Sequence, residues 1–272
     1  MIRSKAMAAL AAGSLLACLV PAVALAQSDT VKQIERYREL LADGNPAELW
    51  EARGEGLWKD KRGPKQASLE TCDLGKGPGV VKGVYAELPR YFKDTDRVMD
   101  LESRLLHCMT GIQGMDAAAI KRMAFGSGTN RSDMEALVAY VTSESKGVKM
   151  KVSTSHPKEK YAYAMGEKLF FYRGGPHDFA CATCHAESGK RIRLQDLPNL
   201  LDKKDAQRAY TTWPAYRVSQ GELRSFQWRL FDCFRQQRFP ALDFGSEASI
   251  ALTTFLAKNA NGAAFNAPAI KR

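Results

Sequence analysis

A short motif late in the chain, Cys181-Ala182-Thr183-Cys184-His185, constrains this 272-residue sequence more than any other feature. Two cysteines three positions apart, followed directly by a histidine, form the spacing that attaches c-type haem. Each thiol can bond one vinyl group, and the histidine then lies under the iron as its proximal ligand. A redox dithiol or a chance match is the alternative, and neither needs a histidine here. The motif therefore predicts one covalently attached haem c.

The first 26 residues have the pattern of a secretory signal peptide. Arg3 and Lys5 supply the positive start, a small and apolar stretch follows, and a small-x-small pattern allows cleavage before Gln27. A membrane span and a lipoprotein cleavage at Cys18 are the alternatives. The stretch is interrupted by Ser and Pro and lacks a basic stop-transfer cluster, which disfavours a span. We expect an exported protein of the periplasm.

The charge balance indicates an anionic partner or substrate. Lys and Arg number 40 against 30 for Asp and Glu, which gives a net charge of +10. The sequence contains no basic run or recognised nucleic-acid reader motif, so we expect no nucleic-acid partner. No segment after the signal approaches the length of a membrane helix, so we expect no membrane span. Hydrophobic residues at 45% supply material for a folded core.

An internal repeat appears when the chain is shifted by 112 positions. Gly54–Trp58 then falls on Gly166–Phe170, and Leu69–Asp73 falls on Cys181–His185. The earlier copy retains one cysteine of the motif and has Asp73 in place of the histidine. It therefore cannot hold haem in the same way.

The repeat predicts an all-α protein with two tandem cytochrome c-like domains, of which only the C-terminal one carries haem. Helices are expected over residues 158–172 and 222–238, and over 246–258 with Ser246 as the N-cap. The expected organisation is a signal peptide at 1–26, an N-terminal helical extension at 27–49, a haem-less domain at 50–148, a linker at 149–154, and a haem-binding domain with a C-terminal tail at 155–272.

A second match, at a shift of 125, accounts for the remaining cysteines. Arg104-Leu105-x-x-Cys108 falls on Arg229-Leu230-x-x-Cys233. Cys72 and Cys108 would both have lined the lost haem cavity, and without haem they can approach and form a disulfide. Chain entropy for a loop of this length suggests a stabilisation of roughly 3–4 kcal/mol. Two free buried thiols are the alternative, which an oxidising compartment disfavours.

Cys233 is the residue that we expect to be the sixth ligand of the iron. The chain after His185 contains no methionine and no further histidine, so Cys233 is the strong ligand left there. Arg229 precedes it by four positions and shares its helix face. Neighbouring arginines lower a thiol pKa and attract small anions, so we expect an activated thiolate. An open sixth site is the alternative.

These features together resemble the SoxA family, the catalytic cytochrome subunits of SoxAX complexes in thiosulfate-oxidising bacteria. The resemblance rests on the C-A-T-C-H motif, the Arg229–Arg235 segment and the haem-less first domain, and covers essentially the whole mature chain. Family members carry two haems or one. Leu69 and Asp73 depart from the motif, so the resemblance implies the one-haem kind with a Cys72–Cys108 disulfide.

The resemblance also implies the roles of the site residues. Cys181 and Cys184 would bind haem covalently, His185 and Cys233 would be its axial ligands, and Cys233 would be the active-site cysteine, found as a persulfide in the family. Arg229 matches the substrate-contacting arginine. The implied reaction joins thiosulfate oxidatively to a cysteine of the carrier SoxYZ. Electrons would leave through haem to a SoxX-like subunit of a heterodimer and then to a soluble cytochrome c.

Two other functions fit parts of the pattern. In a plain electron-transfer cytochrome, Cys233 would only tune the redox potential as an axial ligand. In a haem-based redox or gas sensor, one ligand would leave on reduction and an output surface would be needed. The sequence contains no recognisable signalling domain, which disfavours a sensor.

Overall fold

The computed structural model describes residue 36 and residues 44–126, 130–192 and 195–271. The chain divides into two units, Met1–Gly44 and Asn45–Arg272. The expected signal peptide and most of the expected extension at 27–49 lie outside the described residues. Among the described residues, no helix is long and apolar enough to cross a membrane. The description below concerns the second unit.

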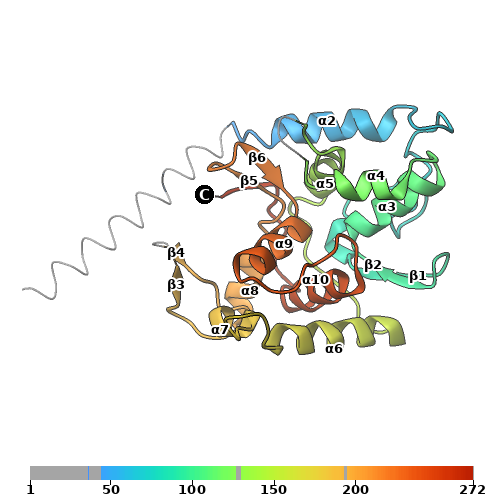
Figure 1. Cartoon of the computed structure of the whole chain (residues 1–272). Coiled ribbons are helices and arrows are strands. Elements are labelled where there is room, and N and C mark those ends of the chain that lie inside the picture. Colours follow the sequence, from blue (N-terminus) through green and yellow to red (C-terminus); the bar gives the residue numbers. More distant parts are fainter. Residues whose placement is uncertain (1–35, 37–43, 127–129, 193–194, 272) are drawn as a thin grey trace, which may run out of the picture. The chain divides into compact units, whose positions relative to one another are not determined.

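This unit is mostly helical, as expected, but it also contains short strands that the sequence pattern did not indicate (Figure 1). The helices are α2 (Glu48–Lys59), α3 (Leu101–Gly111), α4 (Ala117–Arg122), α5 (Asp133–Ser143), α6 (Pro157–Phe171), α7 (Cys181–His185), α8 (Lys203–Tyr210), α9 (Phe226–Gln236) and α10 (Glu247–Asn259), with a 3₁₀ turn at Tyr85–Glu87. The strands are β1 (Arg90–Phe92), β2 (Arg97–Met99), β3 (Arg191–Ile192), β4 (Gln195–Asp196), β5 (Ala215–Arg217), β6 (Glu222–Arg224) and β7 (Ala269–Lys271).

The same helix crossing occurs twice. Helix α2 packs against α5, and α6 packs against α10. At each crossing a glycine faces a backbone carbonyl, Gly54 against Ala136 and Gly166 against Ala251. A Cβ atom at either glycine would overlap that carbonyl oxygen. The glycines, which the 112-residue shift superimposes, therefore allow the two helices of each pair to approach closely.

A hairpin followed by a helix also occurs twice, at a spacing of 125 residues. Strands β1 and β2 precede α3, and β5 and β6 precede α9, with bounds that coincide after the shift. The expected helix over 222–238 was therefore wrong at its start, since Glu222–Arg224 pairs with β5 and the helix begins only at Phe226. Ser225 explains the boundary, because its hydroxyl caps the helix by accepting from the N–H of Trp228 at 3.2 Å.

One continuous apolar core runs through both repeats and contains the Cys72–Cys108 disulfide. This is the pairing that the 125-residue shift predicts. Both cysteines are buried, Cys108 on α3 and Cys72 in the loop between α2 and the 3₁₀ turn. The expected linker at 149–154 also joins this core, because Met150 and Val152 are buried and Met150 N–H donates to the Ala263 carbonyl at 2.9 Å.

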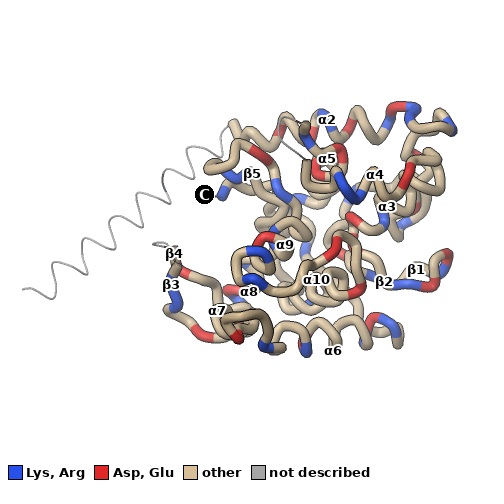
Figure 2. The backbone as a smooth tube through the Cα atoms, viewed as in Figure 1, with Lys and Arg blue, Asp and Glu red and all other residues tan. Residues whose placement is uncertain are grey.

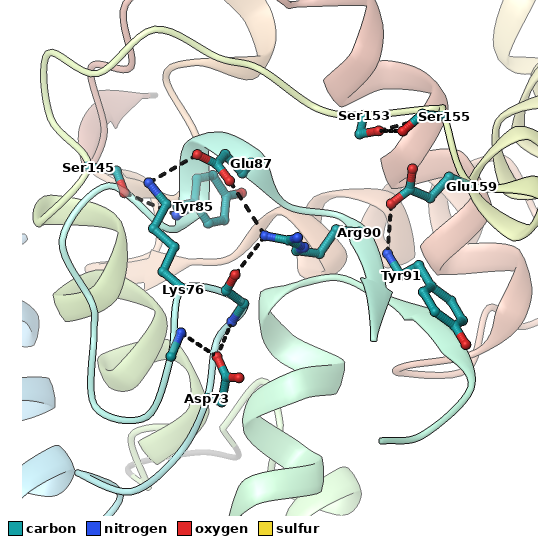
Figure 3. A network of polar contacts seen from close by, with 12 residues as sticks. Asp73, Lys76, Tyr85, Glu87, Arg90, Tyr91, Ser145, Ser153, Ser155 and Glu159 are labelled. Atoms are coloured by element: carbon teal, nitrogen blue, oxygen red, sulfur yellow. Dashed lines mark hydrogen bonds and ion pairs between the residues drawn. The ribbon is translucent and has the colours of Figure 1, made fainter. Parts of the chain in front are cut away.

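Asp73, at the position of the motif histidine, organises a loop of the first repeat (Figure 3). Its Oδ1 atom accepts from the N–H groups of Gly75 at 2.6 Å and Gly77 at 2.9 Å. Arg90 Nη1 donates to the Gly75 carbonyl at 2.7 Å and lies 3.5 Å from Glu87 Oε2. The carboxylate thus holds a compact turn where the second repeat has its imidazole.

Substitution of Gly54 tests the close helix crossing. Gly54→Ala should lower the free energy of unfolding by about 2 kcal/mol, because the new methyl group must push α2 away from the Ala136 carbonyl. Gly56→Ala, on the same helix with open space at its Cβ position, should raise stability by ~0.5–1 kcal/mol. Urea unfolding of both variants measures the difference. Equal changes in unfolding free energy for the two variants would contradict the close approach of α2 and α5 at Gly54.

Candidate functional site

The C-A-T-C-H motif forms the short helix α7 at the end of a loop that follows α6. A bridge between Gly174 and Phe179 closes this loop. The Thr183 hydroxyl accepts from the N–H of Ala180 at 2.9 Å and fixes the start of the helix. Cys181 and Cys184 are half-buried and carry free thiols, so both sulfur atoms are available for a covalent attachment.

His185 is oriented by the chain that follows it. Its Nδ1 atom lies 2.9 Å from the carbonyl oxygen of Pro198, and its own carbonyl accepts from the N–H of Leu200 at 2.8 Å. Burial lowers the pKa of His185, which favours the neutral imidazole. With Nδ1–H donating to Pro198, the Nε2 lone pair is left for a metal.

Helix α9 brings Cys233 to the motif. Cys233 interacts electrostatically with Cys181 and with Cys184, so the three thiols lie near one another. Burial raises the pKa of Cys181 to about 12, and the neighbouring Cys233 sulfur adds to that shift. Burial also raises the pKa of Cys233, although Arg229 and Arg217 oppose it. The sequence-based expectation of a lowered thiol pKa was therefore wrong, because desolvation outweighs the guanidinium charges.

Arg229 is held loosely, in contrast with its counterpart in the first repeat. Its Nη1 atom donates to Asp232 Oδ2 at 3.3 Å, and its side chain is partly exposed. Arg104, 125 positions earlier, donates from Nε to the Asp73 carbonyl at 2.7 Å and lies 2.7 Å from Asp94. The first-repeat arginine is held in place by the Asp73 carbonyl and the Asp94 carboxylate, whereas Arg229 retains donors that can contact an anion.

Buried carboxyl groups from the first repeat hold the start of α9. Glu135 on α5 accepts from Ser225 N–H at 3.2 Å and pairs with Arg224 Nη1 at 3.1 Å. Asp100 accepts from Gln227 Nε2 at 2.6 Å. Glu102 adds a longer contact with the Gln227 N–H at 3.3 Å. Sequence reasoning missed this cluster, because acidic residues on a helix ordinarily predict a solvated face.

The donor set fits a covalently held haem. Cys181 and Cys184 supply two free thiols, and His185 presents Nε2 because Nδ1 is occupied. Cys233 supplies a third free thiol on a separate helix that faces the motif. Two attachment points, an imidazole and a thiol are the groups that a c-type haem requires of its protein.

Comparison with known proteins defines the class. The family model for the SoxA/TsdA cytochrome c domain matches residues 53–150. The SoxXA crystal structure from P. pantotrophus has the same fold, with a TM-score of 0.68 at 23% identity over 84% of this chain and 79% of that chain. The unit is therefore a cytochrome c-like fold of the SoxA type, and a cytochrome c domain implies haem c.

The sequence relatives define the family. The chain is 51% identical to the L-cysteine S-thiosulfotransferase subunit SoxA of Hydrogenophilus thermoluteolus, over 89% of this chain and 88% of that protein. It is 32% identical to a subunit of the same name from Hydrogenobacter thermophilus, over 90% and 91% of the two chains. The chain belongs to the SoxA family.

The buried carboxyl cluster predicts a pH dependence of stability. Burial raises the pKa of Glu135 and of Glu102 from the ordinary 4.5 to about 8. The folded state then binds more protons than the unfolded state between these values, so this contribution is complete below pH 4.5 and is lost as the pH rises to about 8. Glu135→Gln should flatten the decline in unfolding free energy over this window.

Urea unfolding at several pH values measures the slope. Glu55→Gln, which replaces a more exposed carboxylate on α2, is the matched control and should leave the slope unchanged. An unaltered slope in Glu135→Gln would show that this carboxyl group is ionised in the folded protein throughout the window.

Proposed function

We propose that this chain is the catalytic cytochrome subunit of a SoxAX-type complex, an L-cysteine S-thiosulfotransferase that joins thiosulfate to a cysteine of a SoxYZ-like carrier protein. Membership of the SoxA family supports the reaction class. The observation that carries the proposal is the position of Cys233. This thiol lies one helical turn from the loosely held Arg229 and near the two thiols of the C-A-T-C-H motif.

The proposed architecture is two tandem cytochrome c-like domains, residues 50–148 without haem and residues 155–272 with one haem c, joined by residues 149–154. The repeated helix crossing and the repeated hairpin with its helix support this division. So does the match of the cytochrome c family model to residues 53–150, which lack the attachment motif. The Cys72–Cys108 disulfide and Asp73 turn occupy the positions used for haem in the second domain.

In the proposed assignment, Cys181 and Cys184 would hold the haem covalently, and His185 and Cys233 would supply the two protein ligands to its iron. Haem bound there would supply one-electron redox chemistry. A SoxX-like cytochrome subunit and then a soluble cytochrome c are the proposed acceptors, in the periplasm. The Pro198 carbonyl keeps His185 in the tautomer whose Nε2 can ligate iron.

For an S–S bond to form between two sulfur nucleophiles, the pair must lose two electrons in total. In the first proposed step, the Cys233 thiolate bonds the terminal sulfur of thiosulfate, and two electrons leave one at a time to two oxidised acceptor cytochromes. In the second, the carrier thiolate attacks that outer sulfur, and Cys233 leaves as the thiolate. The sum is one new S–S bond on the carrier, with its thiol proton passed to solvent. Arg229 would pair with the sulfonate oxygens and reduce the repulsion between thiosulfate and thiolate.

Cys233 has two proposed roles, since a thiolate bound to iron is a poor nucleophile. The roles are compatible where the sulfur leaves the iron during turnover, or where a persulfide on Cys233 reacts through its outer sulfur. Both routes require the Cys233 sulfur.

Replacement of Cys233 tests the function. Cys233→Ser in the assembled haem-containing complex should lower thiosulfate-conjugating activity by at least ~100-fold, the scale on which removal of a nucleophile acts. Haem content, read from the absorbance of the denatured protein, should be unchanged because Cys181 and Cys184 retain the attachment. Full activity with haem retained would contradict the mechanism and leave electron transfer, with Cys233 only as a ligand, as the function.

The intact mass of the exported, non-reduced protein tests the assigned sites. We expect cleavage before Gln27, the mass of one haem, and the loss of two hydrogens for the Cys72–Cys108 disulfide. A persulfide would add one sulfur that reductant removes. Two haems, or three unmodified thiols besides the attached pair, would contradict the assignment.

A further inference from the structure

A polar cavity of about 480 Å³ adjoins α9 on the side of Asp232. Its walls come from β5, the turn after it, α9 and the residues just beyond α9. The charged and amide side chains that line it are Arg217, Gln220, Asp232, Arg235, Gln236 and Arg238. Three arginines against one aspartate give the cavity a positive charge, so it suits an anionic ligand.

Among the residues that line the cavity, Arg217 has a buried hydrogen-bond donor without a protein acceptor. Its Nε atom is buried and has no hydrogen-bond partner. Its charge interacts with Cys233 and is repelled by Arg229, and burial together with that repulsion lowers its pKa. A buried donor without an acceptor is costly, and a bound oxyanion would remove that cost.

The one carboxylate in the wall attracts Arg217 electrostatically but accepts its hydrogen bonds from other side chains. Asp232 Oδ1 accepts from Arg235 at 2.8 Å, and Oδ2 accepts from Gln236 at 2.6 Å and from Arg229 at 3.3 Å. Both oxygens are therefore committed along α9. The same aspartate contacts Arg235 and Gln236 in the cavity wall and Arg229, which is one helical turn from Cys233, so the cavity adjoins the proposed reaction site through Asp232.

The first repeat supplies an internal comparison. The shift of 125 residues superimposes β1 on β5 and α3 on α9. It places Phe92 at the position of Arg217, Thr110 at that of Arg235 and Gln113 at that of Arg238. Phe92 is buried, and the Arg104 guanidinium lies 4.2 Å from its ring centroid. The shared frame therefore does not require arginines here, and the basic lining belongs to the second repeat.

The size of the cavity indicates the kind of anion. A single tetrahedral oxyanion needs the room of a few water molecules, on the order of 100 Å³. A cavity of about 480 Å³ accommodates several side chains of a peptide as well. Guanidinium groups bind carboxylates through paired N–H donors. The geometry points to an acidic segment of the protein that brings the acceptor cysteine, with its carboxylate on Arg217. This inference rests on the proposed function, and it assigns to the cavity the docking of that carrier protein.

The test uses the assembled haem-containing complex and two variants. Arg217→Phe installs the residue that the first repeat has at this position. Arg238→Asn removes an exposed charge, and Asn tolerates the positive φ of 56° found there. Arg122→Gln, an exposed charge on α4 of the first repeat, is the matched control. Three quantities are measured: the KM for the carrier, the KM for thiosulfate, and the binding of dye-labelled tetraglutamate without turnover.

Arg217→Phe should raise the KM for the carrier and weaken tetraglutamate binding about tenfold each, the usual effect of losing one charge-assisted contact. Arg238→Asn should act in the same direction, and Arg122→Gln should change neither. A rise in the KM for thiosulfate alone would overturn the assignment, because the cavity would then hold the sulfonate. Unchanged values in both variants would also overturn it.

Failure of the proposed function gives a different result. If the wild-type complex conjugates no thiosulfate to the carrier while Arg217→Phe still loses tetraglutamate binding, the acidic-segment site stands and the reaction assignment falls. If wild-type turnover is normal and tetraglutamate does not bind, the reaction stands and the docking site falls.

Discussion

The buried contact between the Glu135 carboxyl group and Arg224 is the interaction on which the site depends. It joins α5 of the first repeat to the residue that precedes the N-cap of α9, and Glu135 also accepts from the Ser225 N–H group. A buried carboxyl group is stable only when its oxygens are satisfied, so the contact fixes where α9 begins. Because Cys233 lies eight residues after Ser225, the first repeat sets the position of the thiol that we propose to be reactive.

This dependence gives the haem-less repeat a physical role. With Asp73 in place of a histidine and Cys72 joined to Cys108, its interior is closed by covalent and polar contacts. It then acts as a rigid block against which α9 is anchored. The same frame in the second repeat retains free thiols at Cys184 and Cys233, so one arrangement carries a disulfide in one half and free thiols in the other. Lys and Arg are distributed along both repeats of the described chain (Figure 2), so the distinction lies in how individual arginines are paired.

The sequence predicted the parts of the fold that depend on short local patterns of residues. The motif, the repeat offsets and the Ser246 cap each depend on a few neighbouring residues, and the cap lies where expected. The strands β5 and β6 were missed because Glu222–Arg224 continues smoothly into a helical pattern, and only the pairing of β5 with β6 and with the distant β7 reveals them. The direction of the Cys233 pKa was also missed, since burial is a property of the whole fold.

In the proposed mechanism, the arginines near Cys233 stabilise the bound anion more than they lower the pKa of the resting thiol. Burial raises the pKa of Cys233 even with Arg229 and Arg217 nearby, so their charges do not by themselves produce a thiolate. Thiosulfate carries two negative charges, and its approach to a buried sulfur is opposed unless fixed positive charge is already in place. Arg229 retains donors because Asp232 holds it only weakly, and Asp232 divides its oxygens among three partners. One carboxylate thus positions the groups that face the substrate while leaving the local field positive.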